Sequence, residues 1–160
     1  MLVGKYPSIL FVCRGNTCRS PMAEAILNNL NNSNFSLIAS AGTQAIRENQ
    51  PPNPKAIEIC KKFNIPISHC ARQITTKDFN TFDYILCMDQ SNLEQLHDLM
   101  PKSFNAHVAL LGEFLNVKDL NEQIIPDPFG GTLEDYENTF KKLLLFDTLL
   151  LDQISHSREL

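Results

Sequence analysis

A cysteine, an arginine and a serine stand close together near the start of the chain, in the run Cys13-Arg14-Gly15-Asn16-Thr17-Cys18-Arg19-Ser20-Pro21. A cysteine near cations or a helix N-terminus becomes a thiolate nucleophile more readily. The planar guanidinium of an arginine binds two oxygens of a phosphoryl group at once. We therefore predict that residues 14–20 bind a phosphoryl group through Arg19 and backbone N–H groups. Cys13 would be the nucleophile, and Ser20 would donate a hydrogen bond to its thiolate.

The residues on either side of this run predict the elements that position it. Residues 8–12 are apolar and rich in β-formers, which is typical of a buried strand in a parallel sheet. Pro21 is typical of the first position of a helix. In a strand–loop–helix unit the loop N–H groups and the positive end of the helix point to one spot, which suits an anion. Gly15 and Asn16 are predicted to supply the positive φ angles of this loop.

Strand and helix patterns alternate along the rest of the chain. The further strands are predicted at Phe35–Ala39, Tyr84–Met88 and Val108–Leu111. The further helices are predicted at Pro54–Phe63, from an N-cap at Ser91 to Met100, and from a capping box at Thr132–Asp135 to about Ile154, with a frayed tail from Ser155. The alternation predicts a single α/β domain over residues 1–160. Its sheet would be doubly wound, four-stranded and parallel, with helices on both faces and the phosphate-binding loop after the first strand.

Composition narrows the class of protein. The apolar share of 43% is ordinary for a globular protein, and a net charge of −4 argues against a nucleic-acid partner. Five cysteines, an odd number, argue against a disulfide framework and favour a reducing compartment, so we expect a cytoplasmic protein. The apolar residues 143–151 are too few to span a membrane. No His or Cys cluster has the spacing of a metal site.

The run from Cys13 to Pro21 resembles the signature of the low-molecular-weight protein tyrosine phosphatases, a Cys, five residues, an Arg and Ser-Pro. Residues 40–43, 68–74 and 82–89 resemble further segments of that family, and Pro126-Asp127-Pro128 resembles its general-acid loop. The resemblance implies hydrolysis of phosphotyrosine in proteins through a cysteinyl-phosphate, with release of inorganic phosphate and no cofactor. Asp127 would protonate the leaving group and then activate water.

The resemblance also implies supporting roles. Asn16, Ser40 and His69 are similar to family residues that brace the phosphate-binding loop through hydrogen bonds. Cys18 is similar to a family cysteine that pairs with the nucleophile under oxidation, which gives a redox pair with Cys13. The three other cysteines are interpreted as packing residues, namely Cys60, Cys70 and Cys87.

Four positions around the predicted pocket mouth depart from the common tyrosine-phosphatase pattern. These specificity positions are Arg14, Thr17, Ile46 and the run Phe129-Gly130-Gly131. Thr17 and Phe129-Gly130 resemble a bacterial branch of the fold that removes phosphate from arginine, so a protein-arginine phosphatase is the alternative function. Arg14 adds positive charge that suits acidic residues beside a phosphotyrosine.

Two remoter alternatives are an arsenate reductase and a non-catalytic phosphopeptide-binding module. The reductase relay needs two further cysteines about seven residues apart, but Glu94 stands where a partner of Cys87 would be. A binding module could lose its nucleophile or its acid, whereas this chain has both Cys13 and Asp127. The tyrosine phosphatase is therefore the favoured function.

Overall fold

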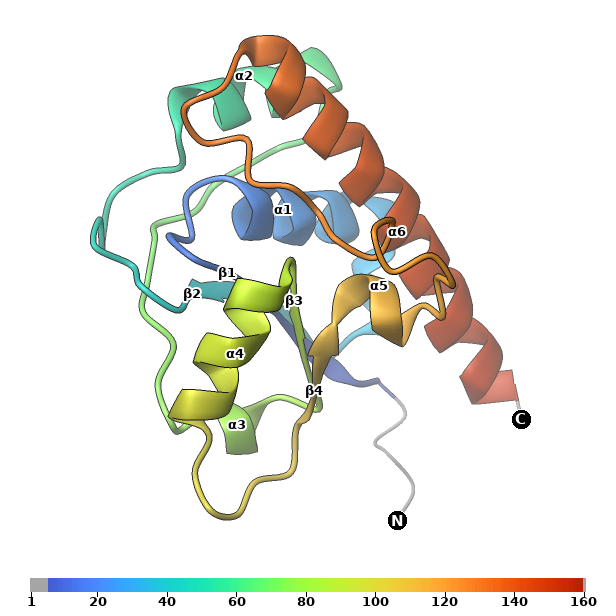
Figure 1. Ribbon diagram of the computed structural model, residues 1–160. Helices are drawn as coiled ribbons and strands as arrows, with labels where there is room; N and C mark the ends of the chain where they lie inside the picture. Colours follow the sequence, from blue (N-terminus) through green and yellow to red (C-terminus); the bar gives the residue numbers. More distant parts are fainter. Residues whose placement is uncertain (1–5, 160) are drawn as a thin grey trace.

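Four parallel strands form one sheet in the order β2-β1-β3-β4 (Figure 1). The computed structural model describes residues 6–159. The strands are β1 Ser8–Cys13, β2 Leu37–Gly42, β3 Tyr84–Cys87 and β4 His107–Leu110. Strand β1 is central, and all six of its residues are buried. The predicted four-stranded parallel sheet is confirmed.

Six α-helices and one short 3-10 helix surround the sheet in the described part of the chain. They are α1 Arg19–Asn31, η1 Asn32–Asn34, α2 Pro54–Lys62, α3 Asp78–Thr81, α4 Gln90–Leu99, α5 Leu111–Phe114 and α6 Leu133–Glu159. Helix α6 packs along α1, as Figure 1 shows. No helix within residues 6–159 has the length and apolarity needed to cross a membrane.

Strand β1 separates two hydrophobic clusters because successive side chains of a strand point to opposite faces of the sheet. Ile9 and Phe11 belong to the cluster that α1, α2 and α6 cover. Leu10 and Val12 belong to the cluster on the other face, where α3 and α4 contribute Phe79 and Leu96. The predicted helices on both faces of the sheet are thus confirmed.

Two predicted boundaries need correction near the sheet. Pro21 is the third residue of α1, which begins at Arg19. Strand β2 begins and ends later than the predicted Phe35–Ala39, because its register against β1 pairs Ser8 with Leu37 and extends to Gly42 beside Cys13. The small residues at its end have weak β propensity, so pairing with a neighbour, rather than local preference, sets this limit.

Two helix ends also differ from the prediction. Asp89, not Ser91, is the N-cap of α4: its side chain accepts from the Asn92 N–H, and the Asn92 side chain accepts from the Asp89 N–H. Helix α6 continues to Glu159 rather than fraying at Ser155, because Ile154 is buried in the core. The capping box at the start of α6 is confirmed, with reciprocal hydrogen bonds between Thr132 and Asp135.

The packing prediction for the cysteines is confirmed for two of three. Cys60 and Cys87 are buried, and burial raises the pKa of Cys60 to about 11. Cys70 is exposed, so its interpretation as a packing residue is wrong. Cys70 lies in the irregular segment after α2. No helix or strand there places its side chain in the core.

Asp147 is a carboxyl group buried in the core side of α6. Its side chain is fully buried, and neither of its oxygens has a hydrogen-bond partner among residues 6–159. The neighbouring positions on the same helix face are Leu143 and Leu150, both fully buried. Burial raises the pKa of Asp147 well above its ordinary value, because a carboxylate loses its hydration in apolar surroundings.

We predict that Asp147→Asn removes a pH-dependent loss of stability. The pKa of Asp147 is higher in the folded state than in the unfolded state, where it is near 4. The contribution of this carboxyl to the unfolding free energy is therefore complete below the unfolded-state pKa and is lost as pH rises towards the folded-state pKa. Between these two pKa values, the unfolding free energy of the variant should therefore increase relative to that of the wild type by up to about 1.4 kcal/mol per pH unit. Urea unfolding at several pH values measures this difference.

The matched control is Asp152→Asn, an exposed aspartate on the same helix. A surface substitution of this kind changes the unfolding free energy by about 0.5 kcal/mol or less. A difference between Asp147→Asn and wild type that stays constant with pH would contradict a neutral carboxyl at this position.

Candidate active site

The loop of residues 14–18 connects the carboxyl end of β1 to α1 and turns its N–H groups inward. The carbonyls of Cys13, Arg14 and Thr17 accept hydrogen bonds from the backbone N–H groups of residues 43, 44 and 53 outside the loop. Because the N–H of a trans peptide points away from its carbonyl, the next N–H groups point to the opposite side. Among residues 6–159, the N–H groups of residues 14–18 have no protein acceptor. The loop is a concave set of donors at a helix N-terminus, which suits an anion.

Asn16 holds this loop in shape from beneath. Its φ of 57° confirms the predicted left-handed backbone, whereas Gly15 does not adopt a positive φ. The Asn16 Oδ1 accepts from the Arg72 N–H at 2.9 Å and from His69 Nε2 at 2.8 Å, and its Nδ2 donates to Ser40 Oγ at 3.0 Å. The predicted bracing residues are thus brought together.

Gly42 allows the end of β2 to approach the loop. A Cβ at this glycine would lie 2.7 Å from the Arg14 carbonyl oxygen and 3.1 Å from the Asn16 nitrogen. Any side chain there would push the loop away from the sheet. The close contact explains why a glycine faces Cys13 in the β1–β2 register.

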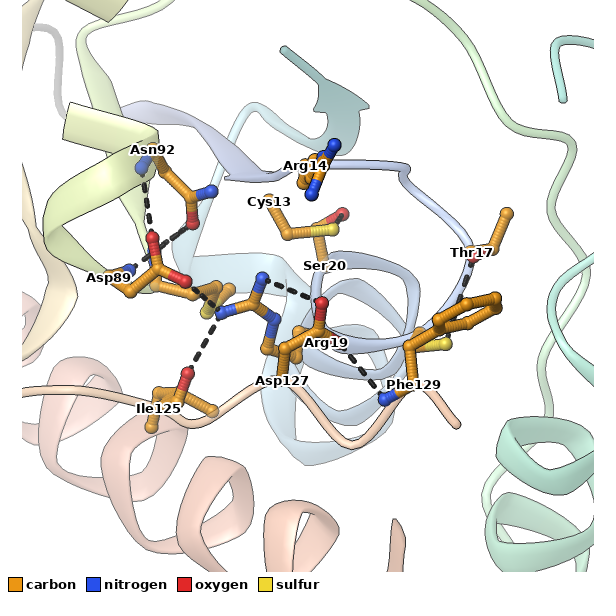
Figure 2. A network of polar contacts seen from close by, with 12 residues as sticks. Cys13, Arg14, Thr17, Arg19, Ser20, Asp89, Asn92, Ile125, Asp127 and Phe129 are labelled. Carbon is orange, nitrogen blue, oxygen red and sulfur yellow. Dashed lines mark hydrogen bonds and ion pairs between the residues drawn. The ribbon is translucent and has the colours of Figure 1, made fainter. Parts of the chain in front are cut away.

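Ser20 connects the bracing network to Cys13. The Ser20 Oγ accepts a hydrogen bond from Asn16 Nδ2 at 2.8 Å and lies 2.9 Å from Cys13 Sγ. Since an oxygen lone pair already takes the Asn16 hydrogen, the hydroxyl hydrogen is free to point to the sulfur. The arrangement fits the predicted hydrogen bond to a thiolate (Figure 2).

Arg19 lies almost completely buried beside Cys13, with 2% of its side chain exposed. Its Nη1 donates to Asp89 Oδ2 at 2.7 Å and to the Ile125 carbonyl at 2.9 Å (Figure 2). Burial alone would lower the pKa of Arg19, but the Cys13 sulfur and the Asp89 and Asp127 carboxylates raise it above its ordinary value. With Nη1 held in this way, Nη2 faces the Asp127 carboxylate (Figure 2).

Asp127 lies across the loop from Cys13 on the segment before α6. Its Oδ1 accepts from the Phe129 N–H at 3.1 Å, and its Oδ2 lies 3.6 Å from Arg19 Nη2. The side chain is 44% exposed. The segment is anchored to the sheet because the Ile125 N–H donates to the Met88 carbonyl. This carboxyl is therefore held at the mouth of the site, in reach of both water and Arg19.

A pocket of about 260 Å³ opens above the loop. Its lining includes the predicted residues Cys13, Arg14, Gly15, Thr17, Cys18, Arg19, Ile46, Asp127 and Phe129. Ile46 and Phe129 are 92% and 60% exposed, so the rim is apolar and open. Gly130 is not among the lining residues; its φ of 81° instead makes the turn after Phe129.

The structure adds residues that the sequence analysis missed. Asp89 pairs with Arg19, and Glu24 lies 3.4 Å from His69 Nδ1. A usable signal existed for Asp89, a carboxylate directly after a predicted strand of the sheet whose carboxyl end holds Cys13. Gln44 and Arg47 also line the pocket, and no sequence signal pointed to them.

Cys18 contacts the long C-terminal helix rather than lying free in the loop. Its Sγ lies 3.3 Å from the Tyr136 hydroxyl of α6. Burial raises the pKa of Cys18, and the hydrogen bonds from Tyr136 and Thr17 offset this in part. The oxidised pairing of Cys18 with Cys13 stays a prediction. Among residues 6–159, no group of three or more His, Cys, Asp or Glu side chains is placed to hold a metal ion.

The fold and this loop define a class of α/β proteins that bind an oxyanion beside a cysteine. Residues 8–158 match the model of the family described as low molecular weight phosphotyrosine protein phosphatase. Proteins of that name from Homo sapiens and Saccharomyces cerevisiae are 43% and 38% identical to the chain. The human alignment covers 84% of this chain and 87% of the relative, and the yeast alignment covers 90% and 92%. The chain belongs to this family.

Solved structures of two kinds of phosphatase are similar to the chain. The Drosophila arginine phosphatase DARP superposes with a TM-score of 0.82 at 32% identity, over 91% of this chain and 96% of that one. A low molecular weight phosphotyrosine phosphatase from Vibrio cholerae superposes with a TM-score of 0.81 at 31% identity, over 92% and 95%. Structural likeness therefore does not separate the two substrates.

We predict that Asp89→Asn lowers the free energy of unfolding by about 1–3 kcal/mol, since a buried guanidinium loses its charged partner while asparagine keeps the N-cap. Inorganic phosphate should then raise the melting temperature of the variant more than that of the wild type, because it supplies Arg19 with another anion. Thermal unfolding with and without phosphate measures both effects.

The control is Asp135→Asn, which makes the same carboxylate-to-amide change at an exposed cap of α6 that accepts from the Thr132 N–H. Phosphate should stabilise this variant and the wild type equally. Equal stabilisation of Asp89→Asn and wild type would contradict the assignment of Asp89 as the charge partner of Arg19.

Proposed function

We propose that this protein hydrolyses phosphotyrosine in proteins through a cysteinyl-phosphate intermediate. The observation that carries the proposal is the position of Cys13 Sγ, which lies in a loop of inward N–H groups with Ser20 Oγ at 2.9 Å and Arg19 beside it. Family membership over residues 8–158 supports the same chemistry.

In the first step the Cys13 thiolate attacks phosphorus in line with the leaving oxygen. The sulfur–phosphorus bond forms as the phosphorus–oxygen bond to tyrosine breaks. Arg19 and the loop N–H groups bind the equatorial oxygens, where charge must be stabilised in the transition state. Asp127 gives its proton to the departing phenolate oxygen, so that tyrosine leaves as a neutral phenol.

In the second step water hydrolyses the cysteinyl-phosphate. Asp127, now a carboxylate, takes a proton from the attacking water, and inorganic phosphate leaves as the sulfur–phosphorus bond breaks. Ser20 stabilises the departing thiolate by its hydrogen bond. The carboxyl serves both steps because it lies at the mouth of the pocket, where leaving group and water occupy the same side of phosphorus.

The rim supports an aromatic substrate. Ile46 and Phe129 are exposed apolar side chains that line the pocket on its open side. A phenol ring entering between them would bury apolar surface and could stack on Phe129. The phosphate group would then reach Cys13 at the base of the pocket.

We predict that Cys13→Ser abolishes turnover and that Asp127→Asn slows phosphotyrosine hydrolysis by about 10²–10⁴-fold. The loss for Asp127→Asn should be much smaller with p-nitrophenyl phosphate, whose more acidic phenol needs less protonation. The kcat/KM on both substrates, measured in chelator-treated buffer, tests these roles.

Asp119→Asn is the matched control, an exposed aspartate in the loop after α5 with a local hydrogen bond to the Asn121 N–H. It should leave both rates unchanged. An equal loss on both substrates in Asp127→Asn would show a structural role for this carboxyl, and turnover by Cys13→Ser near the wild-type rate would exclude Cys13 as the nucleophile.

A protein-arginine phosphatase is the second candidate. Thr17 lines the pocket with a hydroxyl beside the polar loop, and this suits a phosphoguanidine better than an apolar side chain would. The similarity to DARP agrees with this alternative. The apolar rim of Ile46 and Phe129 favours the phenol, so phosphotyrosine remains the proposed substrate.

We predict that wild-type kcat/KM is about tenfold or more higher on a phosphotyrosine peptide than on the same peptide with phosphoarginine. Thr17→Ile should widen this ratio by removing the hydroxyl. Thr17→Ser, which keeps the hydroxyl, is the control and should leave the ratio near its wild-type value. A wild-type preference for phosphoarginine would replace the proposed substrate.

We also propose that the protein acts in the cytoplasm. All five of its cysteines are free in the structure, and a nucleophilic thiol must stay reduced to work. The negative net charge agrees with phosphoproteins, rather than nucleic acids, as its partners.

A further inference from the structure

A second pocket of about 590 Å³ lies directly beside the first. The two pockets share Thr17 and Arg47 as lining residues, so they adjoin at these two side chains. The volume lies within the range of roughly 300–1,000 Å³ that is usual for ligand pockets. Apart from Thr17 of the phosphate-binding loop, the catalytic steps proposed above use no residue of the second pocket, so it is available to another part of a substrate.

The walls of the second pocket are mainly apolar with one cation. Pro51, Pro52 and Ile57 form its apolar wall, and Arg47 is its charged side chain. Arg47 is exposed, and within residues 6–159 it has no hydrogen bond or ion pair from its guanidinium. Glu48, the neighbouring acid, is not among the lining residues.

The residues that line the two pockets carry a net positive charge, although the protein as a whole carries a net charge of −4. Arg14, Arg19 and Arg47 line them against the single carboxylate of Asp127. Arg19 is held by Asp89, and Arg14 Nε donates to Gln44 at 3.0 Å. Gln44 is neutral, so Arg14 keeps its charge in the first pocket, while Arg47 is the cation that also lines the second pocket and is placed to meet an anionic group there.

The backbone around Arg47 is fixed before any ligand binds. The turn at residues 46–49 is tied to the neighbouring segment by hydrogen bonds from the Asn49 N–H to the Ala71 carbonyl and from the Ala71 N–H to the Gln50 carbonyl. On the far wall the Asn53 N–H donates to the Thr17 carbonyl. A pocket with preset walls binds its ligand without the cost of ordering loops.

We propose that the second pocket docks the segment of substrate next to the phosphorylated residue, and that this segment carries an acidic side chain followed by an apolar one. The acidic side chain pairs with Arg47, and the apolar side chain lies against Pro52 and Ile57. The inference rests on the proposed phosphotyrosine phosphatase function and names the class of substrate, an acidic phosphopeptide, that the same site selects.

The test compares three phosphotyrosine peptides that differ only in the flanking residues. The acidic peptide has glutamate followed by leucine, the lysine peptide has lysine followed by leucine, and the alanine peptide has alanine at both positions. For the wild type, kcat/KM on the acidic peptide should exceed that on the lysine peptide by about fivefold, the size expected of an exposed charge pair. Arg47→Glu should reverse this ratio. A ratio within one variant is independent of how much of that variant is folded.

Two further variants sharpen the test. Lys61→Glu makes the same charge change at the other end of α2, away from both pockets, and should keep the wild-type ratio. Ile57→Ser should lower kcat/KM on the acidic peptide with leucine relative to the alanine peptide, since the apolar wall is lost. An unchanged ratio in Arg47→Glu, or the same change in Lys61→Glu, would overturn the docking assignment.

Hydrolysis of p-nitrophenyl phosphate by the wild type separates this inference from the proposed function. Equal kcat/KM on the three peptides, with the small substrate hydrolysed, would overturn the docking site alone. No hydrolysis of the small substrate or of any peptide would overturn the proposed phosphatase, and the docking site with it.

Discussion

The guanidinium of Arg19 is a charge buried in the molecule, and much of the site is arranged to make that burial tolerable. A charged group removed from water is costly unless it is paired and hydrogen-bonded. Asp89 at the end of β3 and the Ile125 carbonyl satisfy one nitrogen, and Asp127 faces another. Two segments far apart in sequence, at Asp89 and at residues 125–127, must therefore converge on one side chain, and that convergence brings the carboxyl of Asp127 to the pocket that Cys13 lines.

The site combines a rigid base with an open rim, and each suits its task. Beneath the loop, both polar side-chain atoms of Asn16 are hydrogen-bonded, and Ser20 connects this network to the sulfur of Cys13. Preset donors stabilise developing charge without reorganisation. At the rim, Ile46 and Phe129 are exposed and leave the substrate side open. The base of the site is thus fixed by buried hydrogen bonds, while its rim consists of a few surface residues.

Asp147 shows that the core also contains a feature that function does not explain. Its carboxyl is fully buried and has no hydrogen-bond partner in the part of the chain that the structure describes, on a helix that packs into the cluster of Ile9 and Phe11. A neutral carboxyl is the form that such a position tolerates, because an unpaired carboxylate would lose far more solvation. The residue therefore makes stability depend on pH at a distance from the loop.

The sequence alone predicted the strand–loop–helix unit, the alternation that gives a parallel sheet, and the roles of Cys13 and Arg19, because these depend on local composition and spacing. The role of Asp127 came from the family resemblance of its loop. The limits of β2 were decided by pairing with a neighbouring strand, which local preference cannot encode. The contacts of Asp89 with Arg19 and the place of Arg47 between two pockets likewise follow only from the way the chain closes on itself.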